Sequence, residues 1–320
     1  MKVLITGASG FVGAAVLKKL LAQSIDTTSL VRKKSSACES AKKIIVDDLV
    51  NLKNDSTTLF DGIDVVIHSA ARVHIMNDEA LDPLEEYRRV NRDATINFAR
   101  LAAESGVQRF VFISSVKVNG EFTHDGTSFG PEVNTPSNDP YGLSKYEAEQ
   151  SLLQIAEETG MEVVIIRLPL VYGEGVKGNF ASMIKWVKRG VPLPLACVNN
   201  LRSLIALDNL VDFIVFCSDK EKSPKAANEV FLVSDGEDVS TSVLLKKIAS
   251  AYGVKPRLLP IPVGVMMFCA NLLGKGDVAD RLFGNLQVDS SKACDLLGWM
   301  PVITMDEQLA KMAEVEGYKS

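Results

Sequence analysis

The chain has 320 residues, of which 47% are hydrophobic and 23% charged, as is ordinary for a soluble globular protein. Its formal net charge of −5 gives no reason to expect a nucleic acid or an anionic membrane as a partner. The five cysteines and three histidines show no metal-ligand or redox spacing. We therefore expect no metal site, and reduced, mostly buried thiols in a cytoplasmic protein.

Strand and helix patterns alternate along the first half of the chain. Apolar runs predict strands at 2–6, 27–32, 43–47, 64–70, 109–115 and 162–168, and helical patterns lie between them, notably at 14–23, 82–105 and 140–159. This alternation predicts an α/β fold with a doubly wound parallel sheet and helices on both faces. The pattern loosens after Pro169, and the length is enough for one full domain and a smaller lobe.

Two segments bear on membrane insertion. The N-terminus begins directly with a core strand, so we expect no signal peptide. The run 263–273 is apolar but too short to span a bilayer, and we expect it to form a core or lid helix.

The first strand is followed by a glycine-rich turn. Gly7, Gly10 and Gly13 separate strand 2–6 from the helical pattern 14–23. Glycines at such a turn allow a tight bend and close backbone approach to a pyrophosphate, while the helix N-terminus offers free N–H groups. The spacing is Gly-x-x-Gly-x-x-Gly, and its place after an N-terminal strand predicts a Rossmann-type dinucleotide site.

The end of the second strand bears on the choice of cofactor. NAD-specific folds place a carboxylate there to hold the ribose 2′-hydroxyl, whereas this strand ends in Arg32-Lys33-Lys34. A cationic cluster can accept a 2′-phosphate through Arg32, so the sequence favours NADP over NAD. The alternative is a solvated basic loop, with NAD held by backbone contacts and Asp48.

Tyr141 and Lys145 lie four residues apart at the start of a predicted helix, so both occupy one face. Asp139 is a suitable N-cap and Pro140 a suitable first helical residue. A cation one turn away would lower the pKa of the phenol, and the tyrosine could then move a proton to or from a hydroxyl group. The alternative is an amphipathic helix that carries both residues by chance.

Together, Thr-Gly-x-x-Gly-x-x-Gly and Tyr-x-x-x-Lys resemble the extended short-chain dehydrogenase/reductases, the NAD-dependent epimerase/dehydratase family. The resemblance covers nearly the whole chain. It implies that 1–168 form a dinucleotide-binding Rossmann domain, to which segments such as 201–220 return, and that 169–320 are mainly the substrate-binding lobe. It also implies a homodimer through the helices near 82–105 and 140–159.

The resemblance implies a role for each matching position. It aligns Ser115, at the end of the fifth strand, with the catalytic hydroxyl beside Tyr141 and Lys145. The implied cofactor contacts are Gly7, Ser9, Gly10, Phe11, Val12, Gly13, Arg32, Asp48, Leu49, Ala70, Ala71, Asn91, Tyr141, Lys145 and Leu168. In this set Asp48 and Leu49 would contact adenine, and Asn91 would hold the active-site strand.

The substrate side also has matching positions. Asn179 and Arg202 align with residues that contact a nucleotide diphosphate, and Arg281 is a further candidate. A diphosphate requires arginine forks or amide donors, so these residues favour a nucleotide-diphosphate sugar as the substrate. Lys117 would either lie near the sugar or cap a surface turn.

The residues after Ser115 narrow the choice among the reactions that the family catalyses. The family's dehydratases have Thr-Asp-Glu there, whereas this chain has Ser115-Val116-Lys117, and Val116 cannot transfer a proton. The family's 4-epimerases usually read Ser-Ser-x-Thr-Val-Tyr-Gly, but here Lys117 and Asn119 replace the threonine and the tyrosine. The pattern most resembles enzymes of bacterial O-antigen synthesis that reduce a UDP-4-keto-6-deoxy-N-acetylhexosamine at C4. The alternatives are a UDP-hexose 4-epimerase (acting on UDP-glucose or UDP-GlcNAc) and, more remotely, a non-catalytic dinucleotide sensor.

Overall fold

The computed structural model describes residues 1–32, 42–46, 48–52, 56–73, 82–133, 135–274 and 276–318, and the side chains of 277, 278 and 281 are not described. Cys38, His74, the Lys33-Lys34 pair and the side chain of Arg281 therefore lie outside the described part.

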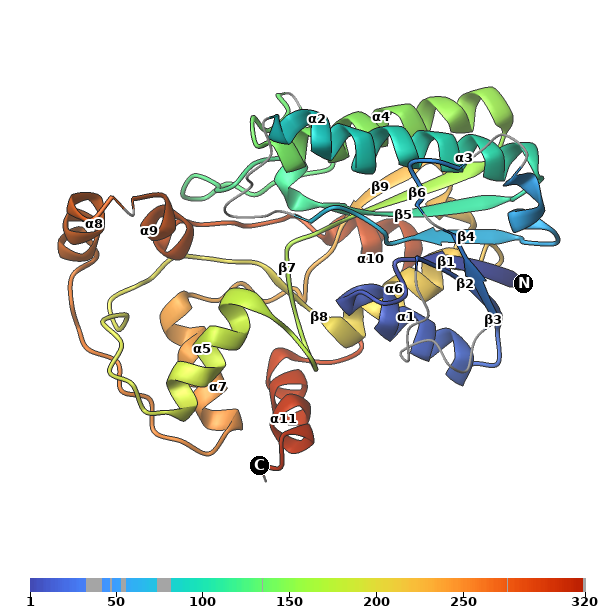
Figure 1. Cartoon of the computed structure of the whole chain (residues 1–320). Helices are drawn as coiled ribbons and strands as arrows, with labels where there is room; N and C mark the ends of the chain where they lie inside the picture. The colour runs from blue at the N-terminus through green and yellow to red at the C-terminus, as the bar shows by residue number, and fades with distance from the viewer. Residues whose placement is uncertain are drawn as a thin grey trace.

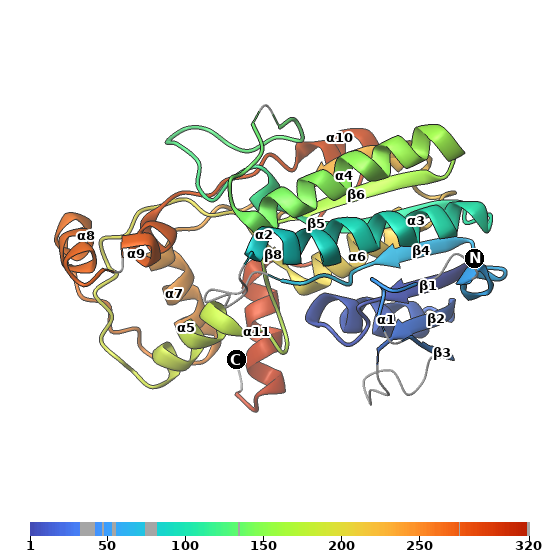
Figure 2. The same cartoon turned by 45° about the horizontal axis from the view of Figure 1, so that its top comes forward.

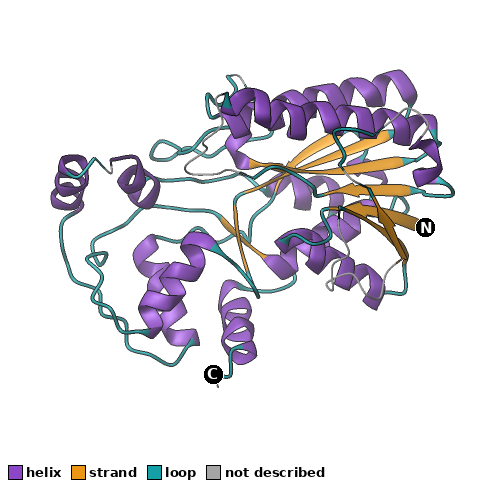
Figure 3. Ribbon diagram, viewed as in Figure 1, coloured by secondary structure: helices purple, strands orange, loops and turns teal. Residues whose placement is uncertain are grey.

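A seven-stranded parallel sheet forms the centre of the larger domain (Figures 1 and 3). Its strands are β1 (Lys2–Thr6), β2 (Asp26–Val31), β3 (Lys42–Ile45), β4 (Val65–His68), β5 (Arg109–Ser115), β6 (Glu162–Leu168) and β9 (Glu229–Leu232). Their order is β3-β2-β1-β4-β5-β6-β9, and every neighbouring pair is parallel. The predicted Rossmann-type doubly wound fold is confirmed.

Helices cover both faces of this sheet (Figure 2). One layer contains α1 (Phe11–Ala22) and α6 (Leu207–Ser218), and the other contains α3 (Ala94–Glu104) and α4 (Pro140–Thr159). Along β1, Val3 and Ile5 belong to the core beneath α1 and α6, whereas Leu4 belongs to the core beneath α3 and α4. This alternation explains why the central strands are apolar throughout, since both faces of the sheet are buried.

The predicted helix 82–105 is interrupted. It consists of α2 (Pro83–Tyr87), the π-helical segment η3 (Arg88–Asp93) and α3. Helix α4, in contrast, has the predicted bounds, with Asp139 as its N-cap and Pro140 in its first turn. The π-helical turn shifts the side chains that face α4, and such turns occur frequently at functional sites.

The second half of the chain builds the smaller lobe around its own apolar core. Its elements are β7 (Leu170–Tyr172), α5 (Gly178–Lys188), β8 (Leu204–Ala206), α7 (Thr241–Ala251), α8 (Val263–Leu272), α9 (Gly276–Phe283) and α11 (Met305–Val315). Three elements of this half, α6, β9 and α10 (Ser291–Leu297), lie in or against the large sheet instead. Short helical turns occur at η2 (Ser56–Phe60), η4 (Val116–Val118) and η5 (Pro224–Ala226).

The run 263–273 was expected to form a core or a lid helix, and the structure excludes the core helix: none of the α8 side chains is buried, and Phe268 and Leu272 are 69% and 78% exposed. The expectation of mostly buried thiols was wrong, because among the described cysteines only Cys217 is buried, whereas Cys269 and Cys294 are exposed. The described helices include none that is long and apolar enough to cross a bilayer.

A fully buried ion pair joins three elements of the large domain. Arg167 of β6 contacts Glu149 of α4 with 2.6 Å between Nη2 and Oε2, and the two side chains are 2% and 0% exposed. Ser114 of β5 donates a hydrogen bond to the same carboxylate. Arg167 also donates to the carbonyl of Pro131 and to the side-chain oxygen of Asn119. This network therefore fixes α4 and the loop after β5 relative to the sheet.

Removing one partner of this pair should destabilise the fold. Arg167→Leu should lower the free energy of unfolding by about 3–5 kcal/mol, because it leaves the Glu149 carboxylate buried without its counter-charge. Urea unfolding measures this loss. The double variant Glu149→Leu/Arg167→Leu should recover part of it, and a double variant less stable than Arg167→Leu would contradict our account. Arg100→Leu, which removes a surface pair with Glu158, is the matched control and should change stability little.

Candidate active site

The glycine-rich turn brings three stretches of backbone together at the carboxyl edge of the sheet. Gly7 has φ +70°, and a Cβ atom there would lie 2.7 Å from the backbone nitrogen of Ala70. A Cβ atom on Gly13 would lie 2.2 Å from the carbonyl oxygen of Gly7. Helix α1 begins after Gly10 without a side-chain cap, so its first N–H groups face the turn. These close contacts fit a phosphate-binding turn, because only glycine leaves the required space.

A buried histidine orders the end of β4. The Nδ1 atom of His68 lies 3.0 Å from the hydroxyl of Thr6, and its Nε2 atom lies 3.1 Å from the hydroxyl of Thr95. Thr6 also accepts a hydrogen bond from the backbone of Ala70. Burial, with a smaller contribution from Lys145, lowers the pKa of His68 to about 3, so its ring is neutral. Sequence reasoning missed Thr6 and Thr95, because a threonine in a core element carries no signal of its own.

The remaining predicted cofactor contacts lie near the same edge. Arg32 is exposed directly after β2, and Asp48 accepts a hydrogen bond from the backbone of Val50. Leu49 packs against the core, and Leu168 pairs in register with Ser115. The structure therefore places these residues at strand ends, where a doubly wound sheet binds its ligands.

The side chain of Ser115 lies near that of Tyr141 and acts to lower the pKa of its phenol. Ser115 ends β5, and Tyr141 lies in the first turn of α4, where the Asp139 carboxylate accepts from the Gly142 backbone at 2.8 Å. A Cβ atom on Gly142 would lie 2.3 Å from the carbonyl oxygen of Lys117. The start of α4 therefore packs directly on the turn after Ser115, and this contact brings the two hydroxyl groups together.

The Lys145 ammonium does not act on Tyr141 as the sequence suggested. Its Nζ atom donates to the carbonyl of Ile113 at 2.7 Å and lies 3.8 Å from the centroid of the Phe112 ring. Burial lowers the pKa of Lys145 to about 7, against an opposing effect of Glu149. Burial likewise raises the pKa of Tyr141 to about 12, although the nearby Ser115 hydroxyl acts in the opposite direction. The phenol is therefore protonated at neutral pH, the form that donates a proton.

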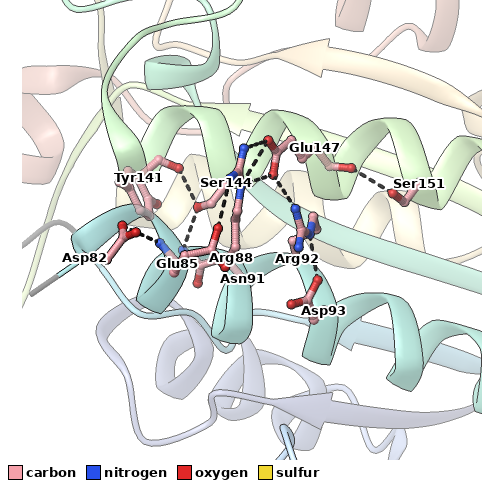
Figure 4. Close-up of polar contacts among 10 residues, drawn as sticks. All are labelled: Asp82, Glu85, Arg88, Asn91, Arg92, Asp93, Tyr141, Ser144, Glu147 and Ser151. Carbon is pink, nitrogen blue, oxygen red and sulfur yellow. Dashed lines mark hydrogen bonds and ion pairs between the residues drawn. The ribbon is translucent and has the colours of Figure 1, made fainter. Parts of the chain in front are cut away.

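Asn91, in the π-helical turn, fixes the first turn of α4 (Figure 4). Its Nδ2 group donates to the carbonyl of Arg72 and to the hydroxyl of Ser144, both at 3.1 Å, and its oxygen accepts from the Arg72 backbone at 2.9 Å. Ser144 in turn donates to the carbonyl of Tyr141 at 2.8 Å. Asn91 therefore joins the segment after β4 to α4, whereas the resemblance implied that it holds the active-site strand.

An aromatic contact and an ion-pair cluster further restrain α4. The rings of Tyr87 and Tyr141 are 5.9 Å apart in an edge-to-face arrangement. Two turns further along, Arg88 and Arg92 of η3 both bind the carboxylate of Glu147 (Figure 4). These contacts were missed from the sequence, because a helical period of 3.6 places the wrong residues of 82–105 against α4.

The predicted substrate residues are dispersed. Lys117 forms ion pairs with Glu121 at 3.0 Å and with Asp139, the N-cap of α4, at 3.2 Å. Asn179 is exposed in the first turn of α5. Arg202 is half-buried, donates to the carbonyl of Gly284 at 3.0 Å, and burial lowers its pKa. Their roles toward a substrate stay predictions.

A cavity of about 480 Å³ lies between the loop after β5 and the lobe. Its lining residues are Thr123, His124, Asp125, Cys197, Val198, Asn199, Asn200, Val263, Phe283, Gly284 and Asn285. Backbone hydrogen bonds from Thr123 to Asn285 and from Phe129 to Gln287 hold the two walls together. A mostly polar hollow of this size can accommodate a sugar or a nucleoside.

The sequence is similar to several characterised proteins. A UDP-glucose 4-epimerase of Vibrio cholerae is 44% identical over 313 residues, which cover 98% of this chain and 94% of that protein. The N-acetyl-alpha-D-glucosaminyl-diphospho-ditrans,octacis-undecaprenol 4-epimerase of Escherichia coli O157:H7 is 29% identical over 281 residues, which cover 85% of this chain and 80% of that protein.

The fold is likewise found among solved structures. The UDP-glucose 4-epimerase of Thermotoga maritima, solved with UDP-glucose, superposes with a TM-score of 0.76 over 99% of both chains, at 22% identity. The UDP-N-acetylglucosamine 4-epimerase of Bacillus cereus gives a TM-score of 0.77 over 98% of this chain and 99% of that one, at 17% identity. The family pattern described as "NAD dependent epimerase/dehydratase family" matches residues 3–233. The chain therefore belongs to the NAD-dependent epimerase/dehydratase family.

Proposed function

We propose that this protein is an NAD(P)-dependent oxidoreductase that acts at C4 of a hexose carried on a nucleoside diphosphate, most simply UDP. The observation that carries this proposal is the proximity of Ser115, at the end of β5, to Tyr141, in the first turn of α4, at the same edge of the sheet as the glycine-rich turn. The turn fits a dinucleotide pyrophosphate, because the space that a side chain would fill at Gly7 and Gly13 is taken by backbone.

Tyr141, Ser115 and Lys145 each have a separate role in the proposed chemistry. A bound nicotinamide supplies or accepts the hydride at C4. Tyr141, whose phenol is protonated at neutral pH, donates the proton to the oxygen on C4 when a ketone is reduced, and takes it back in the reverse direction. Ser115 donates a hydrogen bond to the same oxygen and stabilises its developing negative charge. Lys145 lies one turn further along α4 than Tyr141, and its hydrogen bond to the carbonyl of Ile113 orders the end of β5.

Two net reactions fit this chemistry. Epimerisation at C4 is supported by the similarity to the Vibrio cholerae UDP-glucose 4-epimerase. Net reduction of a UDP-4-keto-6-deoxy-N-acetylhexosamine, for polysaccharide synthesis, is supported by Lys117 and Asn119, which depart from the usual 4-epimerase pattern. Asn119 is also engaged within the protein, with Gly130 and Arg167. Dehydration is disfavoured, because Val116 is a buried apolar side chain where the dehydratases carry an acid.

The sugar carrier is a separate question. UDP is the carrier named for the Vibrio cholerae and Thermotoga maritima proteins, and diphospho-undecaprenol is the carrier named for the Escherichia coli relative. Both contain a diphosphate, which Arg202 and Asn179 would bind. We consider UDP the first candidate carrier, because the Vibrio cholerae protein is more similar in sequence to this chain than the Escherichia coli protein is. We also retain from the resemblance a homodimer through α3 and α4 in the cytoplasm, as a prediction.

Tyr141→Phe should lower turnover at least about 100-fold, because it removes the proton donor. Binding of NADPH, followed by fluorescence, should remain unchanged. Tyr146→Phe, one turn further along α4, is the matched control and should retain activity. Undiminished turnover in Tyr141→Phe would exclude the proposed role, and a protein inactive toward every sugar nucleotide even before mutation would favour the dinucleotide-sensor alternative.

Product analysis by mass spectrometry separates the two net reactions. The protein is incubated with UDP-4-keto-6-deoxy-GlcNAc and NADPH and, in parallel, with UDP-GlcNAc and NAD. A product heavier by two hydrogen atoms in the first reaction identifies the reductase. An isomer of unchanged mass in the second, resolved by chromatography, identifies the epimerase.

Arg32→Ala should raise the KM for NADPH roughly tenfold and leave that for NADH nearly unchanged, because the guanidinium is proposed to bind the 2′-phosphate. Initial rates with the two cofactors measure the difference. Arg100→Ala removes an exposed arginine far along the chain, on α3, and serves as the control. Equal effects of Arg32→Ala on both cofactors would argue against an NADP preference.

A further inference from the structure

Charge is unevenly distributed along the chain. The stretches 175–202 and 239–274 contain nine lysines and arginines and no aspartate or glutamate, so all 40 acidic residues lie elsewhere. Among the described ion pairs, Lys188 contacts Glu316, and Lys247 contacts Glu237 and Asp306. Others, including Lys185, are exposed. The net charge of −5 therefore conceals two stretches of the chain that contain only basic charges.

The same two stretches hold many of the exposed apolar side chains. Of the seventeen large apolar side chains that are exposed in the described part of the chain, nine lie in these stretches. Trp186 on α5 is 44% exposed, and Val265, Phe268 and Leu272 on α8 are 52%, 69% and 78% exposed. The last three follow the spacing i, i+3, i+7, so they share one face of α8. Soluble monomers rarely expose such a contiguous apolar stripe.

We define the outer lobe surface as the end of α5, the segment 255–262 and α8. Backbone hydrogen bonds join Leu193 to Arg257 and Leu259, which places the chain after α5 beside the segment that leads into α8. Arg257 also approaches Gly190. Figures 1 and 2 both place α8 at the end of the lobe farthest from the sheet, next to α9, and none of its side chains is buried.

We propose that the outer lobe surface docks on an anionic lipid bilayer. The exposed Lys255 and Arg257 precede the charge-free apolar helix α8. Cations beside an apolar helix match the two parts of a membrane interface, because the apolar face enters the acyl boundary and the lysines and arginines remain at the anionic head groups. Trp186 is a residue typical of that boundary. A protein partner or a second copy would need acidic groups opposite the same cations, and these two stretches offer none to a symmetric copy.

This docking would place the lobe cavity at the membrane surface. Val263, the first residue of α8, lines that cavity together with Asn199 and Asn285. A substrate whose diphosphate is attached to a membrane-embedded chain could then reach the cavity without leaving the bilayer. The docking itself does not depend on the C4 chemistry, so the two proposals can fail separately.

Sedimentation with vesicles tests the proposal on the full-length protein. Vesicles of phosphatidylcholine alone are compared with vesicles containing half phosphatidylglycerol, at low and at high salt. We expect binding to the anionic vesicles, weakened by salt, and little binding to phosphatidylcholine. Binding to neither, or equal salt-insensitive binding to both, would overturn the proposal.

Paired variants locate the docking surface. Lys255→Glu/Arg257→Glu should weaken partitioning about 25-fold or more, since each such cation contributes about fivefold. Phe268→Ser/Leu272→Ser should weaken it roughly tenfold or more. The matched controls are Lys222→Glu/Lys225→Glu and Met300→Ser/Val302→Ser, which change exposed residues of the same kinds elsewhere. All four proteins should keep the parent's NADPH affinity and its turnover of a water-soluble sugar nucleotide.

Two outcomes would assign the surface differently. Equal losses in the test and control variants would show that general charge, and not the outer lobe surface, drives vesicle binding. Light scattering that reports a dimer for the parent and a monomer for Phe268→Ser/Leu272→Ser would make this surface an interface between copies. Either result overturns membrane docking, whatever the C4 reaction proves to be.

Discussion

The buried pair of Glu149 and Arg167 is the interaction on which the arrangement of the active site depends. It ties α4 to β6, and through Ser114 to β5, one residue before Ser115. Two unpaired charges at this depth would cost several kcal/mol each, so the helix has one position in which both are satisfied. That position sets the height of α4 above the sheet, and with it the place of Tyr141. Arg167 also holds the loop after β5 through Pro131, so the same contact shapes the substrate side.

The charge states of the site follow from this packing. Because α4 lies close against β5, Lys145 points at the Ile113 carbonyl and the Phe112 ring, and burial lowers its pKa to about 7. The same burial raises the pKa of Tyr141, which therefore keeps its proton beside Ser115. A protonated phenol suits the reduction of a ketone directly. The reverse direction requires the phenolate, so oxidation of the sugar should be favoured by conditions that stabilise negative charge on Tyr141.

The sequence was sufficient to predict the structure where local patterns determine it. Central strands buried on both faces are apolar throughout, and the caps Asp139 and Pro140 marked the start of α4 correctly. The sequence was insufficient where contacts between distant elements determine the local geometry. The π-helical turn that orients Asn91 has no signature in a 3.6-residue period. The direction of Lys145 depends on the depth of α4, which spacing alone cannot give. The sequence could not decide whether α8 is a core or a lid helix, because an apolar run of its length fits both equally well.

Net charge is a weak guide to partners, and this chain illustrates why. Electrostatic attraction depends on the field at the contact surface, which decays within about 10 Å at moderate ionic strength. The acidic residues that set the overall value of −5 lie outside 175–202 and 239–274 in the sequence, and Glu316 and Asp306 reach these stretches as partners of Lys188 and Lys247. The same basic bias would favour a diphosphate at Arg202. The proposed substrate binding and the proposed surface docking would therefore draw on one electrostatic property, which arises from the absence of acids from two stretches of the chain that fold side by side.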